Sequence, residues 1–390
     1  MNQPVAPVRI TLSHPADFPD SPLSQALRQP LMLGLFLPIQ AGGWSASKLP
    51  RTTDWAFEYN ADLVRQAEDL GFDLAFGLSQ WLPKGGYGGV LNGQALDSFI
   101  TLGAMAAITR RIMLISTVHV LYGPWHPLHF AKFAATLDHI SKGRWGVNIV
   151  TGHRAVEHEM FGWERIDHDR RYDLATEFLD VVQRLWWESE NFSYQGERWS
   201  LNNAFVTPKP QFGRPVIVNA TGSDAGIAFA AAFSDIVFMT SPTGSEIESA
   251  LESLPAHVAR IKQEARAKGR DVRTLINPLV ICRDTEAEAK AYHQAIIDNA
   301  DTDAAPQGMG RFDSDAHAWR GRSGRDGPAQ RAVGGNIQII GSPEQVAEYI
   351  IRLKGVGIDG IQLSFYDFKP DLTQFGARVL PLLKQAGLRL

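Results

Sequence analysis

The sequence predicts an α/β fold, a (β/α)8 TIM barrel with two insertions. Eight short apolar runs alternate with amphipathic helical patterns along the chain, and 390 residues suffice for one closed barrel. The runs are rich in Val, Ile, Leu and Phe and show little alternation, as expected for strands that are buried on both faces of a parallel sheet. Because such a pattern cannot fix a strand count, an open doubly wound sheet is the alternative.

The predicted strands all lie after residue 30. Residues 1–30 are polar and rich in proline, so they are interpreted as an N-terminal arm, and residues 31–390 as a single barrel domain. The eight strand ranges are 31–37, 72–76, 112–115, 145–150, 215–218, 236–239, 278–281 and 360–365.

Helical periodicity separates these runs. Residues 59–70 and 171–187 carry apolar side chains at helical spacing, and Gly71 ends the first of these helices. A third helix is predicted over 343–353. Its start at Ser342 combines a capping hydroxyl, a proline at the first helical position and a glutamine that can complete a capping box.

Two stretches interrupt the alternation. Residues 186–214 contain turn-forming and extended segments, which predict an insertion with a small hairpin. Residues 301–335 are polar and rich in glycine. A loop of that length in a compact domain is either an exposed surface loop or a mobile lid over a site, and the sequence leaves both open.

Composition excludes several classes of function. The net charge of -4 and the absence of a basic run argue against nucleic acid or an anionic membrane as a partner. Cys282 is the only cysteine, so an internal disulfide and a multi-cysteine metal site are excluded. The chain shows no signal peptide and no apolar run long enough to span a membrane, so a soluble cytoplasmic protein is expected.

Histidines gather in two groups, but neither has the spacing of known metal ligands, so no metal is expected. The groups are His119, His126 and His129, and His153, His158 and His168.

Small polar residues follow several predicted strands, where the active sites of barrels lie. They occur at 116–119, at 151–153 and at 219–223. The turn at 221–226 leads into a helix, whose free N–H groups suit an anion such as phosphate. The adjacent arginines of 169–172 either contact such a group or pair with acids at a solvated helix start.

Four separated segments, in order, resemble the bacterial luciferase-like family of flavin-dependent monooxygenases. They are 133–152, 169–172, 222–226 and 340–346, and the resemblance covers roughly residues 31–390. The branch that looks most similar holds pyrimidine monooxygenase and dimethyl sulfone monooxygenase.

The resemblance implies specific site residues. Contacts to FMN are expected from Ser79, Gln80, Asn148, Glu157, Arg171, Tyr172 and Ser223. Thr117 and Asn148 match the pair that lines the oxygen pocket beside the flavin ring. His153 stands where this branch usually has tryptophan, so it bears on the substrate, either as an acid or base or as a wall of the pocket.

The resemblance also implies a two-component system. A separate flavin reductase would make FMNH2 from NAD(P)H, and this protein would use it with O2 to oxygenate a small sulfone or pyrimidine-like heterocycle. A transient contact with the reductase and a homodimer or homotetramer are expected from the family. The alternatives are an F420-dependent oxidoreductase on the same barrel and a flavin-binding protein without catalysis.

Overall fold

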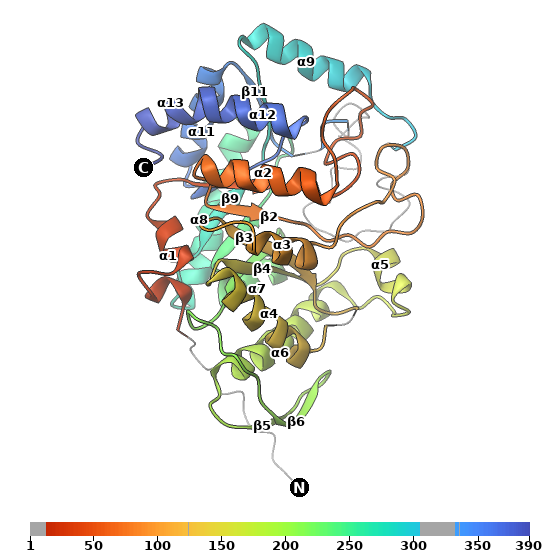
Figure 1. Cartoon of the computed structure of the whole chain (residues 1–390), viewed down its shortest axis with the longest axis vertical. Helices are drawn as coiled ribbons and strands as arrows, with labels where there is room; N and C mark the ends of the chain where they lie inside the picture. The colour runs from red at the N-terminus through yellow and green to blue at the C-terminus, as the bar shows by residue number, and fades with distance from the viewer. Residues whose placement is uncertain (1–12, 124, 305–331, 335) are drawn as a thin grey trace.

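The computed structural model describes residues 13–123, 125–304, 332–334 and 336–390. Eight parallel strands form a closed barrel, which confirms the predicted fold (Figure 1). These strands are β1 (Met32–Phe36), β2 (Leu74–Phe76), β3 (Met113–His119), β4 (Trp145–Val150), β7 (Val216–Ala220), β8 (Ile236–Met239), β9 (Arg273–Ile276) and β12 (Gly360–Leu363). Around the barrel their order is β1-β12-β9-β8-β7-β4-β3-β2.

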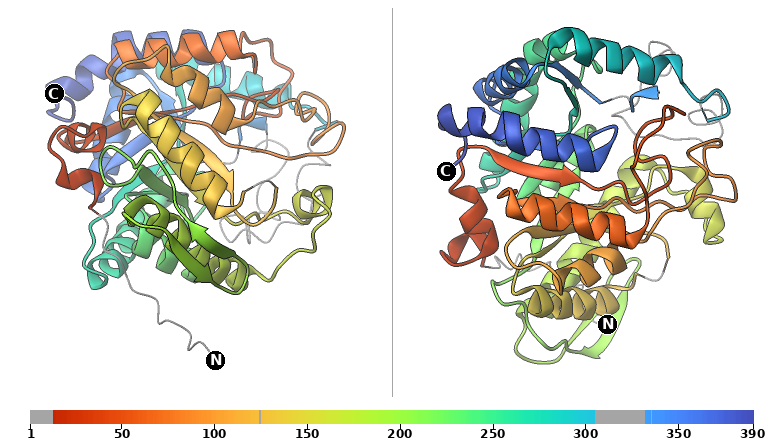
Figure 2. Two further views of the ribbon diagram at one scale, coloured as in Figure 1. Left: turned by 60° about the horizontal axis from the view of Figure 1, so that its bottom comes forward. Right: turned by 45° about the horizontal axis from the view of Figure 1, so that its top comes forward.

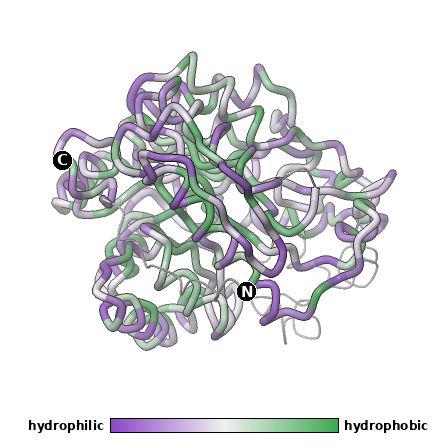
Figure 3. The backbone as a smooth tube through the Cα atoms, turned by 90° about the horizontal axis from the view of Figure 1, so that it is seen from below, coloured by the Kyte–Doolittle hydropathy of each residue, from purple (hydrophilic) through white to green (hydrophobic). Residues whose placement is uncertain are grey.

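Helices surround the strands (Figure 2). Hydrophobic and hydrophilic residues alternate along the outer helices, so that one face of each packs on the barrel (Figure 3). The helices between and after the strands are α2 (Phe57–Asp69), α3 (Ser98–Ala106), α4 (Pro127–Ser141), α5 (Ala155–Met160), α6 (His168–Trp187), α7 (Asp224–Phe233), α8 (Ile247–Ala267), α9 (Glu286–Asp298), α11 (Pro343–Gly355), α12 (Phe368–Gln374), a π-helical turn (Phe375–Val379) and α13 (Leu380–Gln385). Among the residues described, none of these helices combines the length and apolarity of a membrane span.

The seventh barrel strand differs from the predicted one. The more apolar run at 278–281 belongs to β10 (Leu279–Cys282), which pairs with β11 (Gln338–Gly341) in a separate two-stranded parallel sheet. The barrel position is taken by β9, which is short and starts with an arginine. Hydrophobicity alone favoured the wrong run, because β10 is also fully buried.

The two predicted insertions have different outcomes. In residues 186–214 the antiparallel pair β5 (Phe192–Gln195) and β6 (Ser200–Ala204) confirms the predicted hairpin, and it lies at the opposite end of the molecule from α9 (Figure 1). Most of the 301–335 insertion, including its possible role as a lid, lies outside the described residues.

Side chains fill the barrel in layers drawn from alternate strands, as is usual for this fold. Continuing the strand register around the barrel returns to β3 at Leu121 instead of Met113, the stagger expected of eight such strands. We call the end of the barrel at the strands' carboxyl termini the mouth. By this register one interior layer contains Phe76, Phe238, Asn148 and Gln362. The layer above it, nearer the mouth, contains Phe36, Thr117, Ala220 and Asn277. In the lower layer the ring centroids of Phe76 and Phe238 lie 4.8 Å apart, so this layer is half aromatic and half amide.

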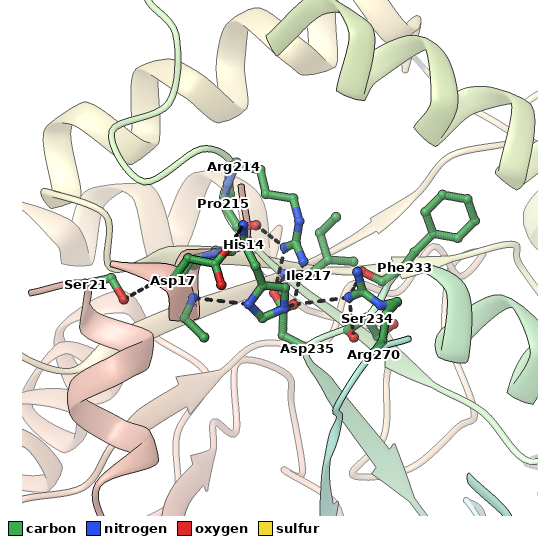
Figure 4. A network of polar contacts seen from close by, with 12 residues as sticks. His14, Asp17, Ser21, Arg214, Pro215, Ile217, Phe233, Ser234, Asp235 and Arg270 are labelled. Carbon is green, nitrogen blue, oxygen red and sulfur yellow. Dashed lines mark hydrogen bonds and ion pairs between the residues drawn. The ribbon is translucent and has the colours of Figure 1, made fainter. Parts of the chain in front are cut away.

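The opposite end of the barrel is closed by a buried ionic network. Figure 4 shows His14, Arg214 and Arg270 converging on Asp235, which directly precedes β8. Arg214 binds both carboxylate oxygens at 2.6 and 2.7 Å, and the Nε2 of His14 lies 2.5 Å from the carboxylate. Burial alone would raise the pKa of Asp235, but Arg214 and His14 hold it far below its usual range.

The N-terminal segment thereby joins the barrel. Its described part forms a 3-10 turn (Pro15–Asp17) and α1 (Pro22–Leu27), and Leu23 and Ala26 pack on barrel residues. The division into an arm and a barrel domain stays a prediction.

Candidate active site

Thr117 and Asn148 lie side by side at the mouth, one at the end of β3 and the other on β4. The Nδ2 of Asn148 donates to the Oγ1 of Thr117 at 3.2 Å, and that hydroxyl donates to the carbonyl of Gly77 at 2.9 Å. The Oδ1 of Asn148 accepts from the backbone N–H of Ala220 at 3.2 Å. Because the Thr117 proton is committed to Gly77, the group with a spare donor is the second N–H of Asn148.

Ser79 lies against the same strand end. Its hydroxyl lies 2.7 Å from that of Ser98 on α3 and 3.1 Å from the carbonyl oxygen of Thr117. Gln80, the next residue, extends away and donates to the side chain of Gln40 after β1. The structure thus places Ser79 beside the Thr117–Asn148 pair and Gln80 in a separate small pocket under the β1 and β2 loops.

A cradle of hydroxyl groups forms where β7 leads into α7. Ser223 caps α7 by accepting from the N–H of Gly226 at 3.1 Å. A Cβ built on Gly226 would overlap the Thr221 hydroxyl and lie 2.7 Å from the Tyr172 hydroxyl and 3.0 Å from the Ser223 hydroxyl. The Oγ1 of Thr221 is buried and has no hydrogen-bond partner. Three hydroxyls therefore converge at a helix N-terminus, where an anion is favoured.

Glu157 forms a second cluster, on α5. Its carboxylate accepts from the Tyr122 hydroxyl at 2.8 Å and from Arg154 at 3.0 Å, and the carboxylate is fully buried. Burial alone would raise the pKa of Glu157, but the positive charges of His119, when it is protonated in acid, of Arg154 and of His153 hold it below its usual range. The carboxylate is therefore ionised at neutral pH.

The same cluster keeps its other groups neutral. Burial and the neighbouring Glu157 raise the pKa of Tyr122, so its hydroxyl stays protonated and continues to donate. Burial lowers the pKa of His119, and it lowers that of His158 to about 4. Both imidazoles are uncharged at neutral pH and pack against the Tyr122 ring.

The remaining predicted residues lie around these clusters. The guanidinium of Arg171 is buried, and its Nη1 donates to the carbonyl of Ile166 at 2.7 Å. His153 follows β4 and is half-buried, near enough to Glu157 to affect its pKa. The structure thus brings together Tyr172 with Ser223, and Thr117 with Asn148 and Ser79, whereas Glu157 and Arg171 lie in a neighbouring group.

Sequence reasoning missed three functional candidates. The motifs of the sequence indicate Thr221 only as part of a turn, and they include neither Tyr122 nor Arg154. For Thr221 the signal was present, because it precedes the capping serine in the same strand-to-helix turn. Arg154 also had a local signal, because it precedes Glu157 by three residues, whereas only the fold brings Tyr122 to Glu157. Within the described ranges, no three His, Cys, Asp or Glu side chains gather as they would around a metal ion.

Known proteins match this chain over most of its length. The family model of the luciferase-like monooxygenases matches residues 32–360. The chain is 33% identical over 364 residues to the FMNH2-dependent dimethylsulfone monooxygenase of Pseudomonas fluorescens (strain Pf0-1), covering 92% of this chain and 96% of that protein. It is also 33% identical over 366 residues to the pyrimidine monooxygenase RutA of Escherichia coli (strain ATCC 8739), covering 91% and 96%.

Solved structures agree on the fold. The crystal structure of riboflavin lyase with modified FMN and riboflavin superposes with a TM-score of 0.80 at 24% identity, covering 93% of each chain. That of the long-chain alkane monooxygenase LadA gives 0.76 at 23% identity, with 93% of each chain covered. These similarities concern the fold alone. Together with the family model and the two relatives, they confirm the predicted family: the chain belongs to the luciferase-like monooxygenases, which are flavin-dependent enzymes that act with O2.

Proposed function

We propose that this protein is the oxygenating component of a two-component system, which takes FMNH2 from a separate reductase and uses O2 to oxygenate a small organic molecule. The observation that carries the proposal is the hydroxyl cradle at the N-terminus of α7. The hydroxyls of Thr221, Tyr172 and Ser223 lie so close to Gly226 that a methyl group there would displace the Thr221 hydroxyl, and that buried hydroxyl has no partner. This arrangement fits a phosphate, whose oxygens accept several hydrogen bonds.

The residues present therefore suit FMN. Ser223, Thr221 and Tyr172 would hold its phosphate, while Ser79, Asn148, Glu157 and Arg171 remain candidates for contacts to the rest of the cofactor. Gln80 is less available for such a contact, because its amide already donates to the side chain of Gln40. When bound, reduced flavin supplies the electrons that O2 activation requires.

The chain's own residues would prepare this chemistry in three ways. Asn148, fixed through Thr117 and Ala220, directs its second N–H to the place where negative charge develops. The aromatic rings of Phe36, Phe76 and Phe238 exclude water from below. The ionised Glu157 fixes Tyr122 and Arg154 at the wall of the site. His153 stays a candidate for an acid or base at the substrate side.

The experiment is a turnover screen with a flavin reductase, NADH, FMN and isotopically labelled O2. Small sulfones and pyrimidine-like heterocycles are the substrates, and the mass of each product is followed. Incorporation of one labelled oxygen atom per product molecule supports the proposal. An anaerobic titration that finds tight binding of reduced F420 and no binding of FMNH2 would favour the alternative of an F420-dependent oxidoreductase. Binding of FMNH2 with no product from any substrate would favour a non-catalytic binder.

The wider setting belongs to the same proposal. We place the protein in the cytoplasm, where NAD(P)H supplies the reductase. A homodimer or homotetramer is supported by apolar side chains on the outer face of α3 and α4: Ile100 is 70% exposed, Ile140 52% and Phe133 47%. Light scattering of the purified protein would test the assembly, and Phe133→Glu would be expected to dissociate it.

A further inference from the structure

Three buried polar atoms on one side of the mouth have no hydrogen-bond partner. They are the Nε2 of Gln362 on β12, the Oδ1 of Asn277 after β9 and the Nε1 of Trp44 after β1. Gln362 is only 2% exposed. Leaving a buried donor or acceptor unpaired destabilises the folded state, so proteins keep few of them. Gln362 lies on β12 and Asn277 directly after the neighbouring strand β9, so their unpaired atoms indicate a place where a ligand supplies the missing partners.

Gln362 and Asn277 both belong to the barrel interior. Gln362 pairs in register with Gly34, and a Cβ built on Gly34 would lie 3.5 Å from the Cγ of Gln362 and 2.7 Å from the Cδ1 of the interior Leu74. Asn277 follows two residues after the interior Leu275. The absence of a side chain on Gly34 leaves the Gln362 amide room inside the barrel.

These amides face the Thr117–Asn148 pair across the mouth. In the strand order, β12 is as far from β4 as a closed barrel of eight allows, and the same is true of β9 and β3. Gln362 shares its layer with Asn148, and Asn277 shares the next with Thr117. In these two layers Thr117 and Asn148 are hydrogen-bonded to each other. On the opposite side of the barrel, Gln362 and Asn277 each keep a side-chain atom without a partner.

We propose that Gln362 and Asn277 recognise the substrate, and that the substrate is a neutral molecule with an amide edge, C=O beside N–H, as in a lactam or cyclic imide. An amide side chain carries a donor and an acceptor at the same end, and its complement is another amide edge. The two layers hold no charged side chain, so nothing in them favours an ion. A dialkyl sulfone offers acceptors only and would leave the Asn277 oxygen unpaired. This assignment deepens the proposed function and rests on it.

The test uses uracil as the probe and calorimetric titration as the measurement, on protein with and without oxidised FMN. Gln362→Met preserves the length of the side chain and removes its hydrogen bonds, and Asn277→Ala removes the facing amide. Each is expected to weaken uracil binding at least tenfold and to leave FMN affinity within twofold. Gln294→Met, on the exposed face of α9, is the matched control and should change neither.

Thermal melting separates recognition from a structural role. Because Gln362→Met removes an unpaired buried group, its melting temperature should equal or exceed that of the wild type. A lower melting temperature with unchanged uracil affinity would overturn the inference, and so would binding of dimethyl sulfone but not uracil by the wild type. If the wild type fails to bind FMNH2 in a separate anaerobic titration, the proposed function fails, whereas uracil binding by the protein without FMN still tests the amide pair.

Discussion

The two ends of the barrel differ in how their buried carboxylates and amides are paired, although the Oγ of Ser234 and the Nε of Arg270 at the closed end also lack partners. At the N-terminal end Asp235 is bonded by Arg214 and His14, and Asp73 by Arg389 at 2.6 Å. At the mouth, Thr221, Asn277 and Gln362 each keep a buried polar atom without a partner. The ion pairs at the closed end stabilise the fold, whereas the unpaired groups at the mouth lower stability and are available to bind ligands. Substitutions at the closed end should therefore unfold the protein, and substitutions at the mouth should disable it while it stays folded.

The largest expected effect is at the closed end. Asp235→Ala leaves the buried Arg214 without its partner, so the free energy of unfolding should fall by about 3–5 kcal/mol. Denaturant unfolding with a fluorescence readout measures it. The affinity of the folded fraction for FMN should not change, and a variant with wild-type stability would contradict the role given to this network.

The next effect is at the mouth. Asn148→Ala removes the spare amide donor, so the oxygenation rate should fall about 10²–10³-fold, with flavin affinity kept within about tenfold. Thr117→Val is the control, because the Thr117 hydroxyl already donates to Gly77; its rate should fall only several-fold. Stopped-flow mixing of the protein–FMNH2 complex with O2 and substrate follows both. Equal losses in the two variants would assign the oxygen contact to Thr117 instead.

A smaller effect depends on pH. Burial raises the pKa of Asp371 to about 6, although Arg283 lies 2.9 Å away. Between the unfolded value of about 3.9 and 6, the folded chain holds a proton that the unfolded chain releases, so Asp371 makes stability fall as pH rises through this window. Asp371→Asn should reduce the difference in stability between pH 4.5 and pH 7.5 by about 2 kcal/mol, measured by denaturant unfolding at the two pH values. Asp235 provides the contrast, because its lowered pKa makes stability fall only under acid conditions.

Sequence reasoning predicted the barrel well because its strands are buried on both faces and read as uninterrupted apolar runs. It misplaced the seventh strand, since the run at β10 is more apolar than β9 and only the pairing with β11 distinguishes them. Gln362 lay inside a predicted strand, but a single polar residue in an apolar run does not reveal which face it occupies.

The candidate site could be predicted only where its residues follow one another. Ser223 lies in a turn with a local signal for phosphate, and the structure adds Thr221 and Tyr172 to it. Of the partners of Glu157, Arg154 lies three residues before it, a local spacing, whereas Tyr122 comes from the segment after β3 and no local pattern connects it. Gln362 lies opposite Asn148 because of the register between the eight strands. No single segment of the sequence determines that register.

The most direct test of the trade between stability and ligand binding at the mouth is an anaerobic titration of Gly226→Ala with FMNH2, paired with its melting temperature. Alanine favours a helix over glycine by about 1 kcal/mol, but its methyl group would displace the Thr221 hydroxyl, so the melting temperature serves to show that the unliganded variant is folded. Its methyl group fills the hydroxyl cradle, so FMNH2 affinity should fall at least tenfold. Unchanged affinity in a folded variant would contradict the cradle as the phosphate site.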